Sequence, residues 1–204
     1  MKSAAAILVF TVSGSFLTCG LALGQSYPAK PVRFMVGFPP GGGNDVVARI
    51  VAAKLGEFWN QTIVIDNRPG ATGTLAANLV ARAPADGYTF LAGAVSTNAI
   101  APSIYSSLPY DAEKAFAPVT LLASIPHLIS VHPSLPVNSL KQLASLAKAN
   151  PGTIAFPSAG SGSTVHIAGE IFMLLSSTKM LHVPYKGAAH GRREGETGRQ
   201  YRRR

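Results

Sequence analysis

The sequence predicts an α/β fold of two lobes, each with a parallel-rich sheet and crossover helices. Short apolar runs alternate with longer stretches whose apolar residues recur at the helical period, the order typical of parallel strands and their crossovers. Glycine-rich loops separate two of these runs from the helices that follow, and a proline-interrupted region divides the chain. With 204 residues, 47% hydrophobic and 13% charged, the chain can bury a core.

The first lobe is expected over residues 25–122 and starts with an apolar strand at 32–36. After the glycines at 41–43, Asn44 or Asp45 is expected to cap a helix. The positions of this helix expected to face inward are Val47, Ile50, Val51, Leu55 and Phe58. The remaining elements are strands at 62–66 and 88–92 and a short helix at 74–82, joined by turns.

The chain is expected to cross between the lobes beyond residue 100. Prolines and serines in residues 100–117 predict a loop with one helical turn. Residues 119–123 and 128–132 predict two extended runs, divided by Pro126.

A partial second lobe is expected over residues 123–189. Ser139 and Gln142 form a capping box that opens a helix, which Asn150 and the following Pro-Gly end. Strands are expected at 153–156 and 181–184. A helix is expected at 164–175, with Val165, Ala168, Phe172 and Leu175 facing inward.

Two loops, Phe38–Asp45 and Pro157–Thr164, lead from a strand into the N-terminus of a helix. Such a loop presents unpaired backbone N–H groups and the positive end of the helix dipole, which suits a carboxylate or phosphate. Each loop alone is also explained as a tight turn, but two in corresponding positions favour a shared anion site.

Individual residues of these loops have separate expected roles. Gly42 is expected to tolerate a β-branched side chain badly. Asp45 would repel an anion, so its expected role is to cap the helix. Hydroxyl donors come from Ser158, Ser161, Ser163 and Thr164.

The motifs of nucleotide hydrolases and serine hydrolases are missing from these loops. Asn44 and Asp45 stand where a P-loop needs Lys and Ser or Thr, and no Gly-x-Ser-x-Gly occurs at residues 158–163. His166 and Glu170 lie four residues apart on one predicted helix face. They leave open a secreted enzyme acting on an anionic substrate, but a capping or surface pair explains them better. We expect no enzyme, no cofactor and no metal.

Positive charge is concentrated at the end of the chain. Residues 190–204 hold six arginines and two glutamates, whereas residues 25–189 hold eleven basic and seven acidic residues. The body is therefore only mildly basic and no nucleic-acid partner is expected, although a basic-tailed interaction protein stays an alternative. Cys19 is the single cysteine, so an intramolecular disulfide is excluded.

Residues 1–24 predict a secretory signal peptide. Lys2 precedes an apolar stretch, and Ala22 and Gly24 put small residues at the −3 and −1 positions of a cut before Gln25. A membrane anchor is the alternative, but serines, threonines and glycines weaken the apolar stretch. We expect export and cleavage near Gly24.

Several motifs then follow one another in a recognisable order, among them Phe-Pro-Pro-Gly-Gly with Asp45 and Asp-Asn-Arg-Pro-Gly ending at Gly70. Together they resemble the Bug-type, TctC-like extracytoplasmic solute receptors of tripartite tricarboxylate transporters, over about residues 27–189. The segments that carry the resemblance are Tyr27–Arg33, Phe38–Gly42, Asp66–Gly70, Asp86–Tyr88, Leu108–Asp111, Phe116–Val119, Ser158–Gly160, His166–Glu170 and His182–Gly187.

The resemblance implies a periplasmic-binding-protein fold that closes over a small carboxylated ligand, such as a di- or tricarboxylate, an amino acid or an aromatic acid. It also implies location in the periplasm and membrane components of a transporter as partners. Carried over by motif and position, the ligand-binding residues are Phe38, Pro40, Gly41, Gly42, Gly43, Asn44, Ser96, Thr97, Asn98, Ser158, Ala159, Gly160, Ser163 and Thr164.

The resemblance ends near residue 189. Family members continue with further apolar elements that complete both lobes, whereas residues 190–204 are arginine-rich and lack apolar periodicity. The change indicates a truncation or a reading-frame shift, with a disordered tail, which would leave this copy non-functional.

Overall fold

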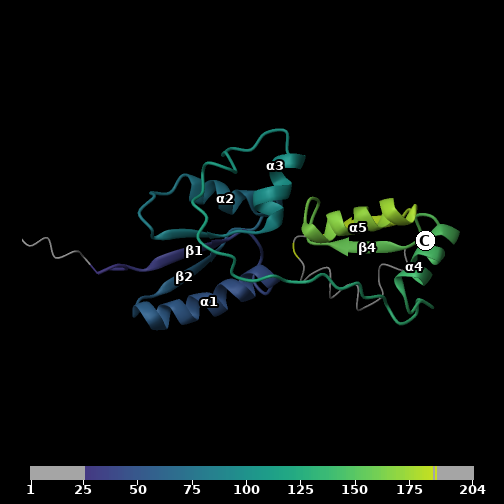
Figure 1. The fold of residues 1–204 in the computed structure, drawn as a ribbon, viewed down its shortest axis with the longest axis horizontal. Coiled ribbons are helices and arrows are strands. Elements are labelled where there is room, and N and C mark those ends of the chain that lie inside the picture. The colour runs from purple at the N-terminus through teal and green to yellow at the C-terminus, as the bar shows by residue number, and fades with distance from the viewer. Residues whose placement is uncertain (1–25, 186, 188–204) are drawn as a thin grey trace, which may run out of the picture.

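The computed structural model describes residues 26–185 and 187 of the chain. The expected signal peptide at 1–24 and the basic tail at 190–204 lie outside these residues. Two α/β lobes lie end to end along the longest axis (Figure 1). Each lobe has a parallel sheet, which confirms the predicted fold class.

The first lobe is built on a three-stranded parallel sheet in the order β2-β1-β3. Its strands are β1 (Val32–Val36), β2 (Ile63–Asn67) and β3 (Thr89–Ala92). The chain moves from β1 to β2 and then back across β1 to β3. Right-handed crossovers therefore place α1 (Gly43–Trp59) and α2 (Thr74–Ala81) on opposite faces, as Figure 1 shows.

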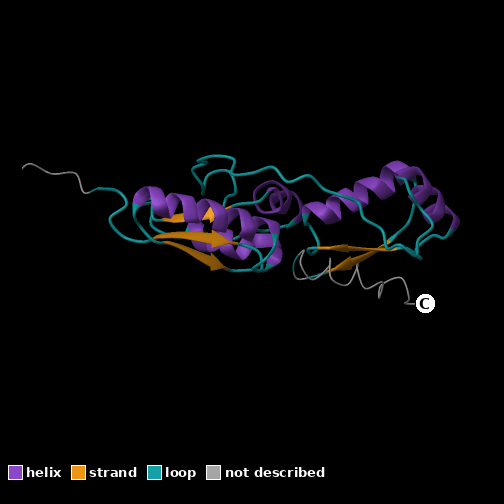
Figure 2. Cartoon of the chain, turned by 90° about the horizontal axis from the view of Figure 1, so that it is seen from below, coloured by secondary structure: helices purple, strands orange, loops and turns teal. Residues whose placement is uncertain are grey.

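The second lobe pairs β4 (Ala155–Ser158) with β5 (Leu181–Pro184) in parallel. Helices α4 (Leu140–Ala149) and α5 (Thr164–Ser176) lie on one side of these strands (Figure 2). Its core consists of Val137, Leu143, Ala147 and Ile154. Ser139 caps the helix as predicted, because its Oγ accepts from Gln142 N–H, while Gln142 Oε1 accepts from the N–H of Asn138, one residue before the N-cap.

The crossing region begins with one helical turn followed by loop, as predicted, and the helical conformation starts before residue 100. A π-helical turn, η2 (Ser96–Ile100), runs directly into α3 (Ala101–Ile104), so the chain is helical up to residue 104. Pro102 is the second residue of α3. Residues 117–132 form no helix or strand, and most of their apolar side chains are exposed, Leu128 by 89%.

The predicted inward faces of two helices are partly wrong. On α1, Ile50 and Phe58 are exposed, and the small residues Ala48 and Ala52 are buried instead. A helix that packs closely on a sheet contacts it through small side chains, which the apolar period alone does not distinguish. On α5, Ala168 and Leu175 are exposed, since two strands cover only part of a helix surface. Among the described residues no helix is long and apolar enough to span a membrane.

Candidate functional site

The first glycine-rich loop joins β1 to α1 and has one conformationally demanding position. Gly41 has φ +81°, in the region that favours glycine. Gly42 is the N-cap of α1 with φ −76° and ψ 161°, which any residue adopts, and a Cβ there would meet its nearest neighbour, Pro39 O, at 3.4 Å. Gly42 was expected to tolerate a β-branched side chain badly, and a forbidden backbone angle is not a reason for it; Gly41 is the residue with that constraint.

Asp45 is the polar centre of this loop and is only 2% exposed. Its Oδ2 accepts from the N–H of Gly41 at 2.9 Å and from Arg49 Nε at 2.9 Å, while Oδ1 accepts from Asn67 Nδ2 at 2.8 Å. Hydrogen bonding from Arg49 is the largest cause that lowers the pKa of Asp45, to about 2. Asp45 thus holds the loop before the helix rather than acting as its N-cap, which is Gly42.

Asn67, which sequence reasoning missed, ties the end of β2 to the same loop. Its Nδ2 donates to Phe38 O at 3.0 Å as well as to Asp45, and its Oδ1 accepts from Arg49 at 3.0 Å. The only signal in the sequence was a polar residue at the carboxyl end of a strand, where parallel sheets place their sites.

The backbone amides of this loop divide into used and unused groups. The N–H of Gly41 donates to Asp45 and that of Gly42 to Pro39 O at 3.4 Å. Within the described residues no partner is present for the amides of Gly43, Asn44 and Asp45, the first three of α1. The donors free for an anion therefore lie slightly later than the predicted Gly41–Gly43 turn.

The second loop runs from Ser158 to Thr164, between β4 and α5. Ser163 is the N-cap of α5, and its Oγ accepts from the N–H of His166 at 3.3 Å. His166 returns the contact, because its Nδ1 accepts from the N–H of Gly162 at 3.1 Å. The N–H of Ser163 donates to Gly160 O. These bonds leave the amides of Thr164 and Val165 without a partner among the described residues.

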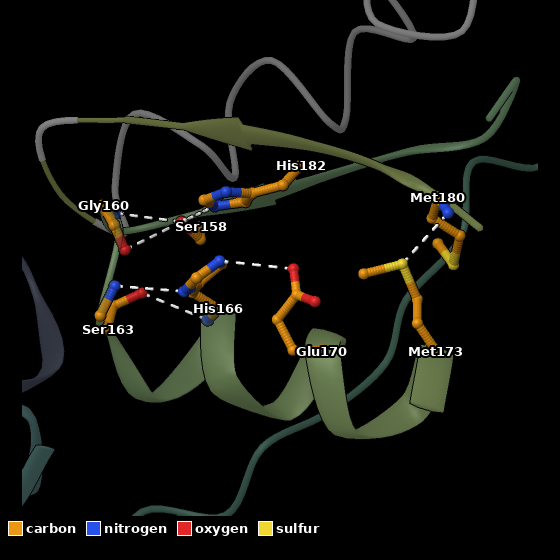
Figure 3. A network of polar contacts seen from close by, with 9 residues as sticks. Ser158, Gly160, Ser163, His166, Glu170, Met173, Met180 and His182 are labelled. Carbon is orange, nitrogen blue, oxygen red and sulfur yellow. Dashed lines mark hydrogen bonds and ion pairs between the residues drawn. The ribbon is translucent and has the colours of Figure 1, made fainter. Parts of the chain in front are cut away.

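Ser158 is buried and its hydroxyl is engaged within the second lobe. Its Oγ lies 2.6 Å from His182 Nε2 and 3.1 Å from both the N and O atoms of Gly160. His182 stacks near His166, with ring centroids 4.0 Å apart, and Figure 3 shows the two imidazoles facing each other between Ser158 and Glu170. Burial, and then the neighbouring His166, lower the pKa of His182. No spacing in the sequence predicted that these residues would meet.

The expected binding residues after β3 are more buried than predicted. Ser96 and Thr97 are buried in η2, and Thr97 Oγ1 donates to Thr72 O at 2.9 Å. Asn98 is exposed. Of the three, only Asn98 presents its side chain to solvent.

Contacts between the lobes bring the two loops into one region. Thr72 Oγ1 of the first lobe donates to Ser161 O of the second loop at 2.9 Å. A Cβ on Gly187, just after β5, would meet Pro39 Cγ of the first loop at 2.9 Å. Both glycine-rich loops therefore border the junction of the lobes.

His166 and Glu170 form a weak pair rather than a reactive centre. The distance from His166 Nε2 to Glu170 Oε1 is 3.5 Å. In the part of the chain that the structure describes, no group of three or more His, Cys, Asp or Glu side chains is arranged to hold a metal ion. His166 instead contributes to the cap at the N-terminus of α5, where it bonds to Gly162 and Ser163. This agrees with the predicted capping role.

Comparison with known proteins gives a single family. Residues 47–198 match the family described as "Tripartite tricarboxylate transporter family receptor", so the match continues past residue 189. Protein BugT of Bordetella pertussis is 36% identical over 185 residues, which are 88% of this chain and 57% of BugT. A UPF0065 protein encoded in the tcbD-tcbE intergenic region of Pseudomonas sp. (strain P51) is 37% identical over 81% of this chain and 49% of its own length. The chain spans about half the length of these curated relatives.

Solved structures show the same fold. R. palustris Rpa4515 with adipate is 40% identical, with a TM-score of 0.82 over 85% of this chain and 58% of that one. MatC (Rpa3494) from Rhodopseudomonas palustris with bound malate is 31% identical, with a TM-score of 0.78 over 85% and 59%.

Proposed function

Because the chain belongs to the tripartite tricarboxylate transporter receptor family, we propose that it is a receptor for a small carboxylated solute. We place it in the periplasm, supplying a tripartite tricarboxylate-type transporter. The family consists of solute-binding receptors and not of enzymes, so an enzymatic role for His166 and Glu170 is set aside.

The observation that carries this proposal is a set of amides at two helix N-termini bordering the lobe junction, for which the described residues supply no partner. Gly43, Asn44 and Asp45 begin α1, and Thr164 and Val165 lie in the first turn of α5. Such amides, with the positive end of each helix dipole, stabilise a carboxylate without a side-chain cation. Neither loop holds Lys or Arg, and the nearby Arg49 is bonded to Asp45 and Asn67.

The predicted binding residues then divide by role. We propose that Gly43, Asn44 and Thr164 contact the ligand through their backbone. Ser158 and Ser163 shape the second loop, since their hydroxyls are bonded to His182 and to the N–H of His166. Phe38, Pro40, Gly41, Gly42, Ala159, Gly160 and Asn98 keep their place as expected lining of the site.

The ligand class is proposed as dicarboxylates of about four to six carbons. Support comes from two relatives of this fold, one described with adipate and the other with bound malate. A dicarboxylate also suits a site with two helix N-termini. Each N-terminus can bind one carboxylate, or both can bind the same carboxylate. Adipate and malate are therefore the first probes.

Proline substitution removes a chosen amide, although at Gly43 the added Cβ would lie 3.1 Å from Ile125 Cδ1, so that side chain must shift slightly. Proline is favoured at the first position of a helix, where its fixed φ fits and the missing N–H is not needed. Gly43 and Thr164 both occupy that position, and the residues before them are extended, as a residue before proline prefers. A charge-assisted hydrogen bond contributes about 1.5–3 kcal/mol. Gly43→Pro or Thr164→Pro should therefore raise the Kd for the bound dicarboxylate by about tenfold or more.

The matched control is Leu140→Pro, at the first position of α4, where Ser139 is extended and the helix lies outside the proposed site. Calorimetric titration with adipate and malate is compared with 1,6-hexanediol, which lacks the carboxylates. Binding of the diol as tightly as adipate, or equal affinities for Thr164→Pro and Leu140→Pro, would contradict carboxylate binding by these amides. Absence of binding to every carboxylate tested would contradict the receptor function itself.

A further inference from the structure

The turn between β2 and α2 has an unusual backbone. Four consecutive residues have positive φ: Gly70 at 142°, Ala71 at 45°, Thr72 at 60° and Gly73 at 92°. Positive φ is common for glycine, but it is a genuine outlier for a β-branched residue such as Thr72. Backbone strain of this kind persists only where the surrounding structure imposes it, and such positions cluster at functional sites.

The first lobe imposes this conformation through its interior. Thr97 Oγ1 donates to Thr72 O at 2.9 Å, and the N–H of Gly73 donates to Gly70 O at 2.9 Å. A Cβ on Gly37 would meet Gly73 Cα at 2.5 Å, so the turn lies directly against the end of β1. Thr97 is only 2% exposed and its hydroxyl is bonded to this turn, whereas its position after the third strand had suggested a place at the ligand.

The strained turn directs the Thr72 side chain at the other lobe. Its hydroxyl donates to Ser161 O at 2.9 Å, a contact between residues 89 positions apart. The hydroxyl oxygen of Tyr105 lies 3.3 Å from Thr72 Oγ1. Because the Thr72 hydrogen is used on Ser161, Tyr105 supplies the donor in that second contact.

Thr72 and His166 hold the two ends of one peptide group. The carbonyl of Ser161 and the N–H of Gly162 belong to the same planar trans unit and point in opposite directions. The carbonyl accepts from Thr72, and the N–H donates to His166 Nδ1 at 3.1 Å. This peptide lies two residues before Thr164, whose amide faces the proposed ligand. Its orientation therefore depends on a residue of the first lobe.

We propose that Thr72 is a positioning residue that latches the second glycine-rich loop to the first lobe and so aligns the amides at the start of α5 for the ligand. This rests on the proposed function for its effect on binding, but the latch itself is a hydrogen bond between protein atoms of the two lobes, so it can be tested without ligand. Loss of the hydroxyl should loosen the junction and weaken ligand binding together.

Three substitutions of Thr72 distinguish the effect of its hydroxyl from that of its strained backbone, and a fourth variant controls for the stability of the turn. Thr72→Val removes the hydroxyl and keeps the β-branched side chain, Thr72→Ser keeps the hydroxyl, and Thr72→Gly removes both hydroxyl and strain. Thr74→Val is the matched control, because Thr74 Oγ1 donates to Ala71 O at 2.9 Å inside the same turn and not across the lobes.

The primary measurement needs no ligand. Spin labels at Lys54→Cys on α1 and Lys148→Cys on α4, both exposed, report the distance between the lobes, with Cys19 replaced by serine. We expect a narrow distance distribution for the parent protein, Thr72→Ser and Thr74→Val, and a broader and longer one for Thr72→Val and Thr72→Gly. A Thr72→Val distribution equal to that of the parent would overturn the latch.

Adipate titration of the same proteins gives the second readout. The loss of one neutral hydrogen bond should raise the Kd of Thr72→Val about three- to tenfold, while Thr72→Ser stays near the parent. Broader distances with unchanged adipate affinity would refute the alignment of the ligand amides. If neither the parent protein nor any variant binds adipate, malate or any other carboxylate tested, the proposed function fails, while the distance measurement still decides the latch.

Discussion

Asp45→Asn is the change that most directly tests how the first loop is held. The carboxylate takes three donors, from Gly41, Arg49 and Asn67. Asparagine has the same shape but offers one oxygen and one NH2 group. In one orientation the NH2 faces Asn67 Nδ2, and in the other it faces both Gly41 N–H and Arg49. Either way, donors are placed against donors.

The size of the effect follows from the pKa of Asp45, which falls from 3.8 to about 2 in the folded protein. Each unit corresponds to about 1.36 kcal/mol, so ionised Asp45 stabilises the fold by about 2 kcal/mol. Because the side chain is only 2% exposed, solvent screening reduces this little. With the facing donors, we expect Asp45→Asn to lower the free energy of unfolding by about 2–3 kcal/mol.

Urea unfolding at neutral pH measures this loss. Glu57→Gln on the same helix is the matched control, since the ion pair of Glu57 with Lys54 is exposed on both sides and should contribute less than about 1 kcal/mol. The Asp45 contribution is fully present above pH 3.8 and is lost as the pH falls towards 2. About 1 kcal/mol of the difference between parent and variant should disappear from pH 5 to pH 3.

An unfolding free energy of Asp45→Asn equal to that of Glu57→Gln would refute the reasoning. So would a difference from the parent that does not change between pH 5 and pH 3.

Two further predictions concern the loops. Gly41→Ala should lower the unfolding free energy by about 1 kcal/mol, because alanine at φ +81° is strained although nothing lies within 4 Å of its Cβ. Gly42→Ala, at φ −76°, should be neutral or slightly stabilising, and equal losses in urea unfolding would contradict the assignment. The pKa of His182 is lowered below 6.5 by burial and by His166, so the unfolded chain binds the proton more readily. The Tm should therefore fall as the pH drops below about 6.5, and the fall should be smaller in His182→Gln. Parallel Tm-against-pH profiles for the parent and His182→Gln would show that His182 does not contribute to the loss of stability at low pH.

Local patterns in the sequence determined the elements and the nature of the site. A run such as residues 181–184, a capping serine such as Ser139 and the glycines before α1 act through neighbours a few positions away. The strand at 32–36 and the helix starting points could therefore be predicted, and with them two helix N-termini able to bind an anion. The ordered motifs also indicated the receptor family that the comparisons confirm.

Only the tertiary structure decided which polar groups of the candidate site are bonded within the fold. Asp45 meets Asn67, Ser158 meets His182 and Thr72 meets Ser161 because strand order and crossovers bring separate elements together. None of these pairs has a spacing set by a helix or strand period. Once the pairs form, they use the amide of Gly41 and the hydroxyl of Ser158. The free amides of Gly43 and Thr164 remain, because a helix cannot satisfy its own first N–H groups.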